Sequence, residues 1–167
     1  MMKVIGIDPG LASTGIGIVW GRGDRLCGCS YGCIHTTPAQ DTPRRLEKIF
    51  SGLQRVAAEE APALMIVEEV FSLGRHPRSG LSLGQVSGVV MLAAAQAAIP
   101  LVEVAVREAK QVLTGNGNAS KDQLEKAVRG RLGLDAPIRP FHAADALGLA
   151  IIGLMRYGHA ARRSDST

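Results

Sequence analysis

The order of strand and helix patterns along the chain is the feature that most constrains its fold. Residues suited to β-strands fill the segments 3–8, 14–20 and 26–36, and only short turns separate them. Three consecutive strands with short links predict an antiparallel meander. Thr42 as cap and Pro43 as the first helical residue then predict the start of a helix, which Pro62 ends.

Strands and helices alternate in the rest of the chain. A short, continuous apolar run over residues 63–67 predicts a central strand covered on both faces. A polar loop over 71–80 follows it. The remaining predicted elements are helices over 83–99, 106–113, 120–132 and 141–157, and a strand over 101–105. Helices between the later strands imply parallel crossovers, so we expect an α/β protein. Its mixed five-stranded sheet combines the antiparallel meander with parallel strands and is flanked by helices.

Length and composition narrow the class further. A chain of 167 residues predicts one domain, over residues 1–158, followed by a polar, flexible tail over 159–167. The net charge of +4 is a weak indication of nucleic-acid binding. We see no signal peptide and no apolar run of the ~18 residues that a membrane span needs, and we expect a cytoplasmic protein. The three cysteines at 27, 29 and 33 are expected to be small buried residues on one strand face.

Two carboxylates stand at the ends of the most apolar strands. Asp8 closes the first strand, and Glu68 follows the run over 63–67. If these strands are parallel neighbours, both side chains emerge at the carboxyl edge of the sheet, where open α/β sheets place their sites. Glu69 points to the opposite face. The alternative for Asp8 is a turn residue before Pro9-Gly10.

A third carboxylate lies within the most apolar helix of the chain. Asp145 has no lysine or arginine three or four positions away, and an unpaired buried charge is costly. His142 precedes it by three residues and shares its helix face. Together with Asp8 and Glu68, these two side chains predict a site for hard cations, with three oxygen ligands and one nitrogen ligand. Two such cations clamp the attacking and departing oxygens in a phosphodiester displacement.

Basic residues follow each part of the proposed site and suit a polyanionic substrate. They are Arg75, Arg78, Arg107, Lys110 and Lys121.

Several motifs in this order resemble the RuvC family of Holliday-junction resolvases. They are Gly6-Ile7-Asp8-Pro9-Gly10 with Thr14-Gly15, Val67-Glu68-Glu69-Val70-Phe71, Leu83-Gly84-Gln85 with Gly88, Lys110-Gln111 with Gly115-Asn116-Gly117, Lys121, and Ala143-Ala144-Asp145-Ala146-Leu147. The resemblance runs from about residue 2 to about residue 157. It implies a ribonuclease-H-like fold and a homodimer. It also implies symmetric, metal-dependent cutting of two strands of a four-way DNA junction in recombination and repair, with the branch-migration proteins RuvA and RuvB as partners.

The resemblance also assigns residue roles. The family's catalytic, metal-binding acids correspond to Asp8, Glu68 and Asp145. The chain has His142 where the family commonly has an aspartate, and imidazole is an accepted metal ligand. Lys121 is expected to act in catalysis. Expected DNA contacts are Phe71, Arg75, Arg78, Lys110 and Lys121. The cofactor is expected to be Mg²⁺ or Mn²⁺, two per site, with Mn²⁺ favoured by the imidazole ligand.

Three alternatives remain open at this stage. The chain could be another ribonuclease-H-like nuclease, or a catalytically silent junction-binding module. An actin-like kinase or ATPase has a similar opening motif but needs two such domains. For the two-fold interface we predict the helix over 83–99, where Gly84 and Gly88 allow close approach; alternatively, both glycines pack against the sheet of the same subunit.

Overall fold

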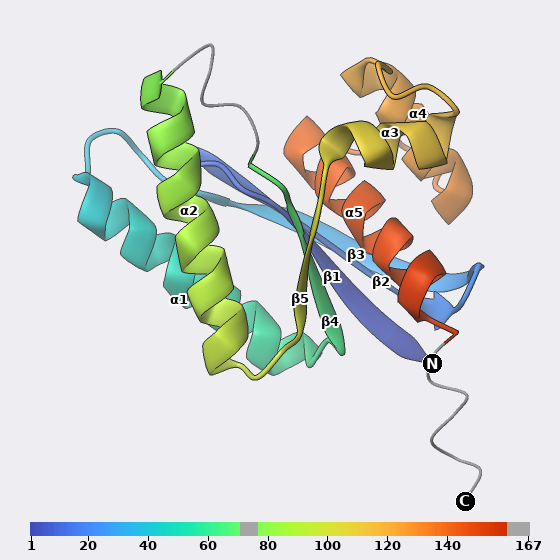
Figure 1. Ribbon diagram of the computed structural model, residues 1–167, viewed down its shortest axis with the longest axis horizontal. Helices are drawn as coiled ribbons and strands as arrows, with labels where there is room; N and C mark the ends of the chain where they lie inside the picture. Colours follow the sequence, from blue (N-terminus) through green and yellow to red (C-terminus); the bar gives the residue numbers. More distant parts are fainter. Residues whose placement is uncertain (71–76, 160–167) are drawn as a thin grey trace, which may run out of the picture.

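The protein has a five-stranded mixed sheet at its centre. The computed structural model describes residues 1–70 and 77–159. The strands are β1 (Met2–Asp8), β2 (Ser13–Arg22), β3 (Arg25–His35), β4 (Leu64–Glu68) and β5 (Leu101–Val104). They lie in the order β3-β2-β1-β4-β5 (Figure 1). The first three pair antiparallel, while β1, β4 and β5 pair parallel, which confirms the predicted sheet.

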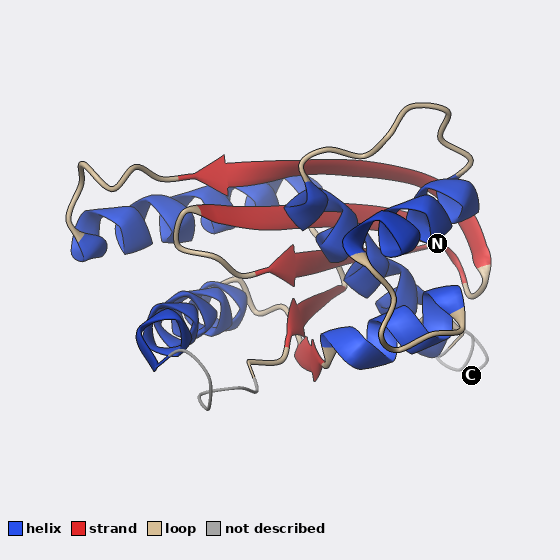
Figure 2. Ribbon diagram, turned by 90° about the horizontal axis from the view of Figure 1, so that it is seen from above, coloured by secondary structure: helices blue, strands red, loops and turns tan. Residues whose placement is uncertain are grey.

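Helices cover the two faces of this sheet. They are α1 (Thr42–Glu60), α2 (Pro77–Gln96), α3 (Val106–Thr114), α4 (Lys121–Leu132) and α5 (Phe141–Tyr157). Helices α1 and α2 lie together on one side of the strands and α3, α4 and α5 on the other, as two views at right angles show (Figure 1 and Figure 2). Each side buries its own apolar cluster against the sheet. None of the described helices combines the length and apolarity needed to cross a bilayer.

The helix starts follow local capping chemistry. The Asp41 side chain, rather than the predicted Thr42, caps α1 by accepting a hydrogen bond from the Arg44 backbone N–H at 3.1 Å. Ser120 caps α4 and forms a reciprocal capping box with Gln123. Such caps satisfy backbone donors that the first helical turn leaves without partners.

The predicted bounds of the loop before α2 were wrong. Helix α2 begins at Pro77, six residues before the expected start at residue 83, because proline suits the first turn of a helix. Arg78 therefore belongs to α2 rather than to a loop. Phe71 and Arg75 lie outside the described residues, as does the expected tail from residue 160 onward.

The expectation for the cysteines is only partly met. Cys29 and Cys33 are partly buried and pack against the apolar cluster beneath α5. Cys27 is exposed. It lies near the β2–β3 turn, where the strand register shifts between Trp20 and Gly21.

Candidate active site

Two of the predicted carboxylates stand side by side at the carboxyl edge of the sheet. Ile7 on β1 is the register partner of Val67 on the parallel strand β4, so Asp8 and Glu68 follow at equivalent positions. Both side chains point to the face that α5 covers, since they alternate with residues of the opposite apolar cluster. Asp8 is only 6% exposed, so it is not a solvent-facing turn residue.

Glycines let α5 lie directly on the strands. A Cβ atom on Gly6 would lie 2.0 Å from the Ala146 carbonyl oxygen, and one on Gly15 would lie 2.1 Å from that of His142. A Cβ on Gly17 would meet the Leu147 backbone at 2.3 Å. No other residue type fits at these positions. The close approach places the first turns of α5 over the end of β1.

This packing brings His142 into contact with Asp8. His142 Nδ1 lies 2.7 Å from Asp8 Oδ2, so the ring N–H donates to the carboxylate. The hydrogen bond with Asp8 raises the pKa of His142, while burial opposes the rise. The hydrogen bond also fixes the orientation of the imidazole over the site.

The other two carboxylates are unusually hard to ionise. Burial raises the pKa of Glu68 to about 8, and a hydrogen bond with Asp8 and the charges of Asp8 and Asp145 add to the rise. Burial, followed by the charge of Asp8, raises the pKa of Asp145 to about 6. These carboxyl groups therefore share one electrostatic site.

Two lysines face the same site. The positive charges of Lys110, on α3, and Lys121, at the start of α4, both lower the pKa of Asp145. Lys110 also lowers the pKa of Glu68. The structure thus brings together six predicted residues: Asp8, Glu68, Lys110, Lys121, His142 and Asp145. It does not describe Phe71, Arg75 or the side chain of Arg78.

The donor set fits divalent cations. Carboxylates and imidazole are side chains that divalent cations accept as ligands, and burial together with the mutual repulsion of these carboxylates raises the pKa values of Glu68 and Asp145. Over residues 1–70 and 77–159, no three His, Cys, Asp or Glu side chains are already arranged as a cage around one ion. Asp8 Oδ2 instead contacts His142 Nδ1 at 2.7 Å, and to bind a cation these two groups would give up this hydrogen bond.

One signal for the site was missed in the sequence. The alternation Gly15-Ile16-Gly17, together with Gly6, marks a strand surface that a helix backbone touches. Glycine is disfavoured inside strands unless a close approach requires it. That rule could have predicted which strands α5 covers.

The sheet order, with α5 across β1 and β2 and acidic residues at the carboxyl edge, is that of the ribonuclease-H-like nucleases. A yeast mitochondrial Holliday junction resolvase shares the fold, with a TM-score of 0.64 and 13% identity over 98% of this chain and 81% of that one.

Comparison with known sequences and with a more similar structure identifies the family within this fold class. The family model of crossover junction endodeoxyribonuclease RuvC matches residues 4–153. A RuvC from Trichlorobacter lovleyi is 41% identical over 156 residues, which are 93% of this chain and 86% of the relative. The structure of Thermus thermophilus RuvC in complex with Holliday junction substrate matches with a TM-score of 0.85 and 32% identity, covering 96% of this chain and 97% of that one. The chain belongs to the RuvC family of crossover junction endodeoxyribonucleases.

Proposed function

We propose that the protein resolves four-way DNA junctions by symmetric, metal-dependent hydrolysis of one phosphodiester bond on each of two strands, in recombination and repair. The observation that carries this proposal is the shared electrostatic site of Asp8, Glu68 and Asp145 beside two lysines, in a chain of the RuvC family. An acidic cluster of this kind attracts cations, and the lysines suit the phosphates of the substrate.

In this proposal Asp8, Glu68, His142 and Asp145 hold two divalent cations. When bound, such cations activate a water molecule and stabilise the departing oxygen, which leaves a 5′-phosphate and a 3′-hydroxyl. Glu68 must release its proton before it can act as a ligand, and the charge of Lys110 favours that release. The glycine contacts of α5 hold Asp145 and His142 in place over the strand ends.

The lysines act on the substrate rather than on the cations. Lys121 is exposed at the first position of α4 and near the carboxylates, so its ammonium group can stabilise the charge that develops on the phosphoryl oxygens. Lys110 contacts a neighbouring phosphate. Phe71, Arg75 and Arg78 remain predicted DNA contacts.

A panel of substrates tests the proposed function. We expect the protein to cut a synthetic four-way junction in the presence of divalent cations and to leave a linear duplex and an RNA–DNA hybrid of the same sequence intact. If the protein cut the RNA–DNA hybrid in preference to the junction, it would be a ribonuclease-H-like nuclease with a different substrate. Junction binding without any cutting would indicate a silent binding module.

His142 leads to a prediction about the metal. Imidazole is a better partner for Mn²⁺ than for Mg²⁺, so saturating Mn²⁺ should support faster cleavage, by roughly 3- to 10-fold. The variant His142→Asp replaces the nitrogen ligand by oxygen and should shift the preference toward Mg²⁺. Single-turnover rates in each metal measure both effects. Equal rates with the two ions in the wild-type protein would argue against His142 as a ligand.

A homodimer through α2 is also part of the proposal. Leu81 and Leu92 are exposed on this helix, by 65% and 51%. Among the described residues, no atom outside the α2 backbone lies within 4 Å of a Cβ built on Gly84 or Gly88, so neither glycine packs against the described part of the sheet. An exposed apolar helix face with small residues suits close contact with a second copy. A C2 dimer presents the same site twice, which matches a two-fold junction.

A single substitution tests the interface. Leu92→Glu places a charge on the proposed contact face and should convert the dimer to a monomer in sedimentation experiments, with an apparent mass near half that of the wild type. The control Val112→Glu alters a 41%-exposed aliphatic residue on α3 and should leave the mass unchanged. A wild-type protein that sediments as a monomer at all concentrations would contradict the proposed dimer.

The remaining expectations rest on the family resemblance. We propose that the protein acts in the cytoplasm and cooperates with the branch-migration proteins RuvA and RuvB.

A further inference from the structure

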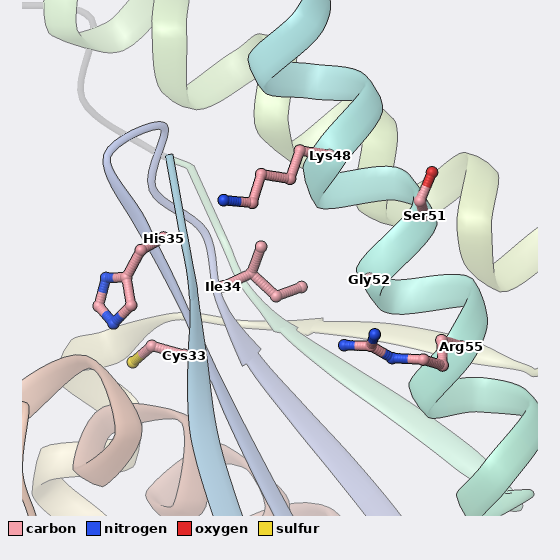
Figure 3. A pocket seen from close by; sticks show the side chains of 7 residues that line it. All are labelled: Cys33, Ile34, His35, Lys48, Ser51, Gly52 and Arg55. Atoms are coloured by element: carbon pink, nitrogen blue, oxygen red, sulfur yellow. The ribbon is translucent and has the colours of Figure 1, made fainter. Parts of the chain in front are cut away.

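A groove lies between the edge strand β3 and helix α1, outside the carboxylate site. Its volume is about 450 Å³. Cys33, Ile34, His35, Lys48, Ser51, Gly52 and Arg55 line it (Figure 3). A Cβ on Gly52 would lie 2.6 Å from Ile34 Cδ1, so this glycine lets Ile34 pack close to the helix at the base of the groove.

The charge of the groove is entirely positive. Figure 3 shows Lys48 and Arg55 reaching from α1 toward β3. Neither forms an ion pair with any residue of the described ranges, and no lining residue is acidic. The neighbouring cation Arg44, by contrast, pairs with Glu47 at 2.8 Å. Lys48 and Arg55 are therefore available to an external anion.

The edge of the sheet adds further donors to the groove. Within the described residues, β3 pairs only with β2, so its outer edge has no strand partner. An edge strand presents N–H groups that its neighbour does not use. Ser51, which lies between Lys48 and Arg55 in the sequence of α1, also lines the groove. The combination of two cations and free backbone donors is suited to phosphate oxygens.

The groove continues the edge of the sheet that carries Asp8. Both β1 and β3 run antiparallel to β2, so the carboxyl end of β3 lies at the same edge as that of β1. Gly15 on β2 pairs with Asp8 on one side and with Cys33 on the other. Cys33 is therefore two strands, or about 10 Å, from Asp8. Asp8 points to the face that α5 covers, whereas Lys48 and Arg55 approach β3 from the side of α1, so a DNA strand held at the carboxylates would pass over this edge of the sheet to reach the groove.

We propose that this groove binds the phosphodiester backbone of the junction DNA next to the cleaved bond, with Lys48 and Arg55 contacting phosphates. The inference rests on the proposed function, because it assigns the same substrate to a second surface. The position of the groove favours DNA over an acidic protein segment, since the polyanion must already lie at the adjoining edge. By holding these phosphates, the groove would fix the direction in which one duplex arm of the junction leaves the carboxylate site.

Removing the two cations tests this proposal. The double variant Lys48→Ala/Arg55→Ala should bind a four-way junction roughly 10- to 100-fold more weakly at moderate salt. The slope of log affinity against log salt concentration should fall in magnitude by about 2, since each lost phosphate contact releases fewer counterions. Both side chains are exposed, so the melting temperature should not change.

A matched control also removes two positive charges, but at the turn of the β2–β3 hairpin, far from the groove. Arg22 and Arg25 are exposed register partners at the β2–β3 turn, away from the carboxylate edge. The double variant Arg22→Ala/Arg25→Ala should retain wild-type affinity and salt slope. If both double variants lost the same amount of junction affinity, the loss would come from net charge alone, and the proposal would be overturned.

Neutral phosphates locate the contact on the DNA. Methylphosphonate substitution at one or two phosphates within a few nucleotides of the cut should weaken binding by the wild type and have no further effect on the Lys48→Ala/Arg55→Ala variant. If the wild type binds junctions and the Lys48→Ala/Arg55→Ala variant binds them equally well, the proposed DNA contact of the groove is overturned, but the proposed function is not. A wild type that fails to bind junctions would overturn the proposed function as well.

Discussion

The variant Asp8→Asn should lose junction cleavage by at least about 10³-fold and still bind the junction with near wild-type affinity. Asp8 is central to the site, because its carboxylate contacts His142 and its charge raises the pKa values of both Glu68 and Asp145. Asparagine keeps the size of the side chain but removes the charge that a cation needs. Binding through the lysines does not depend on that charge.

Single-turnover cleavage and a metal-free binding assay separate these two effects. The control Asp24→Asn removes an exposed carboxylate in the turn between β2 and β3 and should cut at the wild-type rate. An Asp8→Asn variant that keeps more than a tenth of the wild-type rate would show that Asp8 is not a ligand in catalysis.

In the absence of divalent cations, raising the pH from about 5 to about 9 should destabilise the protein by roughly 2–5 kcal/mol. The folded protein holds a proton on Glu68 up to a pKa of about 8, whereas the unfolded chain releases it near the ordinary value of 4.5. The stabilisation by that proton is complete below pH 4.5 and is lost as the pH rises through 8. The pKa of Asp145 is raised to about 6, and the pKa of His142 is also raised. The loss of these two protons at higher pH therefore lowers the stability of the fold as well.

The variant Glu68→Gln isolates this effect. It should raise the melting temperature of the metal-free protein at pH 9 and flatten the pH dependence of that temperature, while it abolishes cleavage.

Mg²⁺ should stabilise the wild type more at pH 9 than at pH 6, because protons compete with the cation. The control Glu69→Gln alters the neighbouring carboxylate, for which the strand alternation predicts the opposite face, and should keep the wild-type pH dependence. An identical pH dependence in Glu68→Gln and wild type would contradict the shared site.

Much of the site could be predicted because it depends on local patterns. The apolar runs before Asp8 and Glu68 predicted adjacent parallel strands, and the register confirms that the two carboxylates end at the same edge. Asp145 was identifiable because a carboxylate within an apolar helix is costly to bury unless it has a partner or a ligand. His142 followed from its spacing on the same helix face.

Other features depend on tertiary packing and could not be predicted locally. The hydrogen bond between His142 and Asp8 joins residues 134 positions apart and requires the close approach of α5 that Gly6 and Gly15 allow. The groove beside β3 exists only because α1 packs near that strand, so Lys48 and Arg55 resembled ordinary solvated residues in the sequence. The early start of α2 at Pro77 was hidden by the glycines and prolines around it.

Mapping the cuts on a synthetic four-way junction tests the central claim most directly. With Mg²⁺ or Mn²⁺, the wild type should make two cuts at symmetric positions on the two strands of like polarity, each leaving a 5′-phosphate, and Asp8→Asn should make none. Failure to cut the junction, or cutting of a linear duplex of the same sequence at an equal rate, would contradict the account.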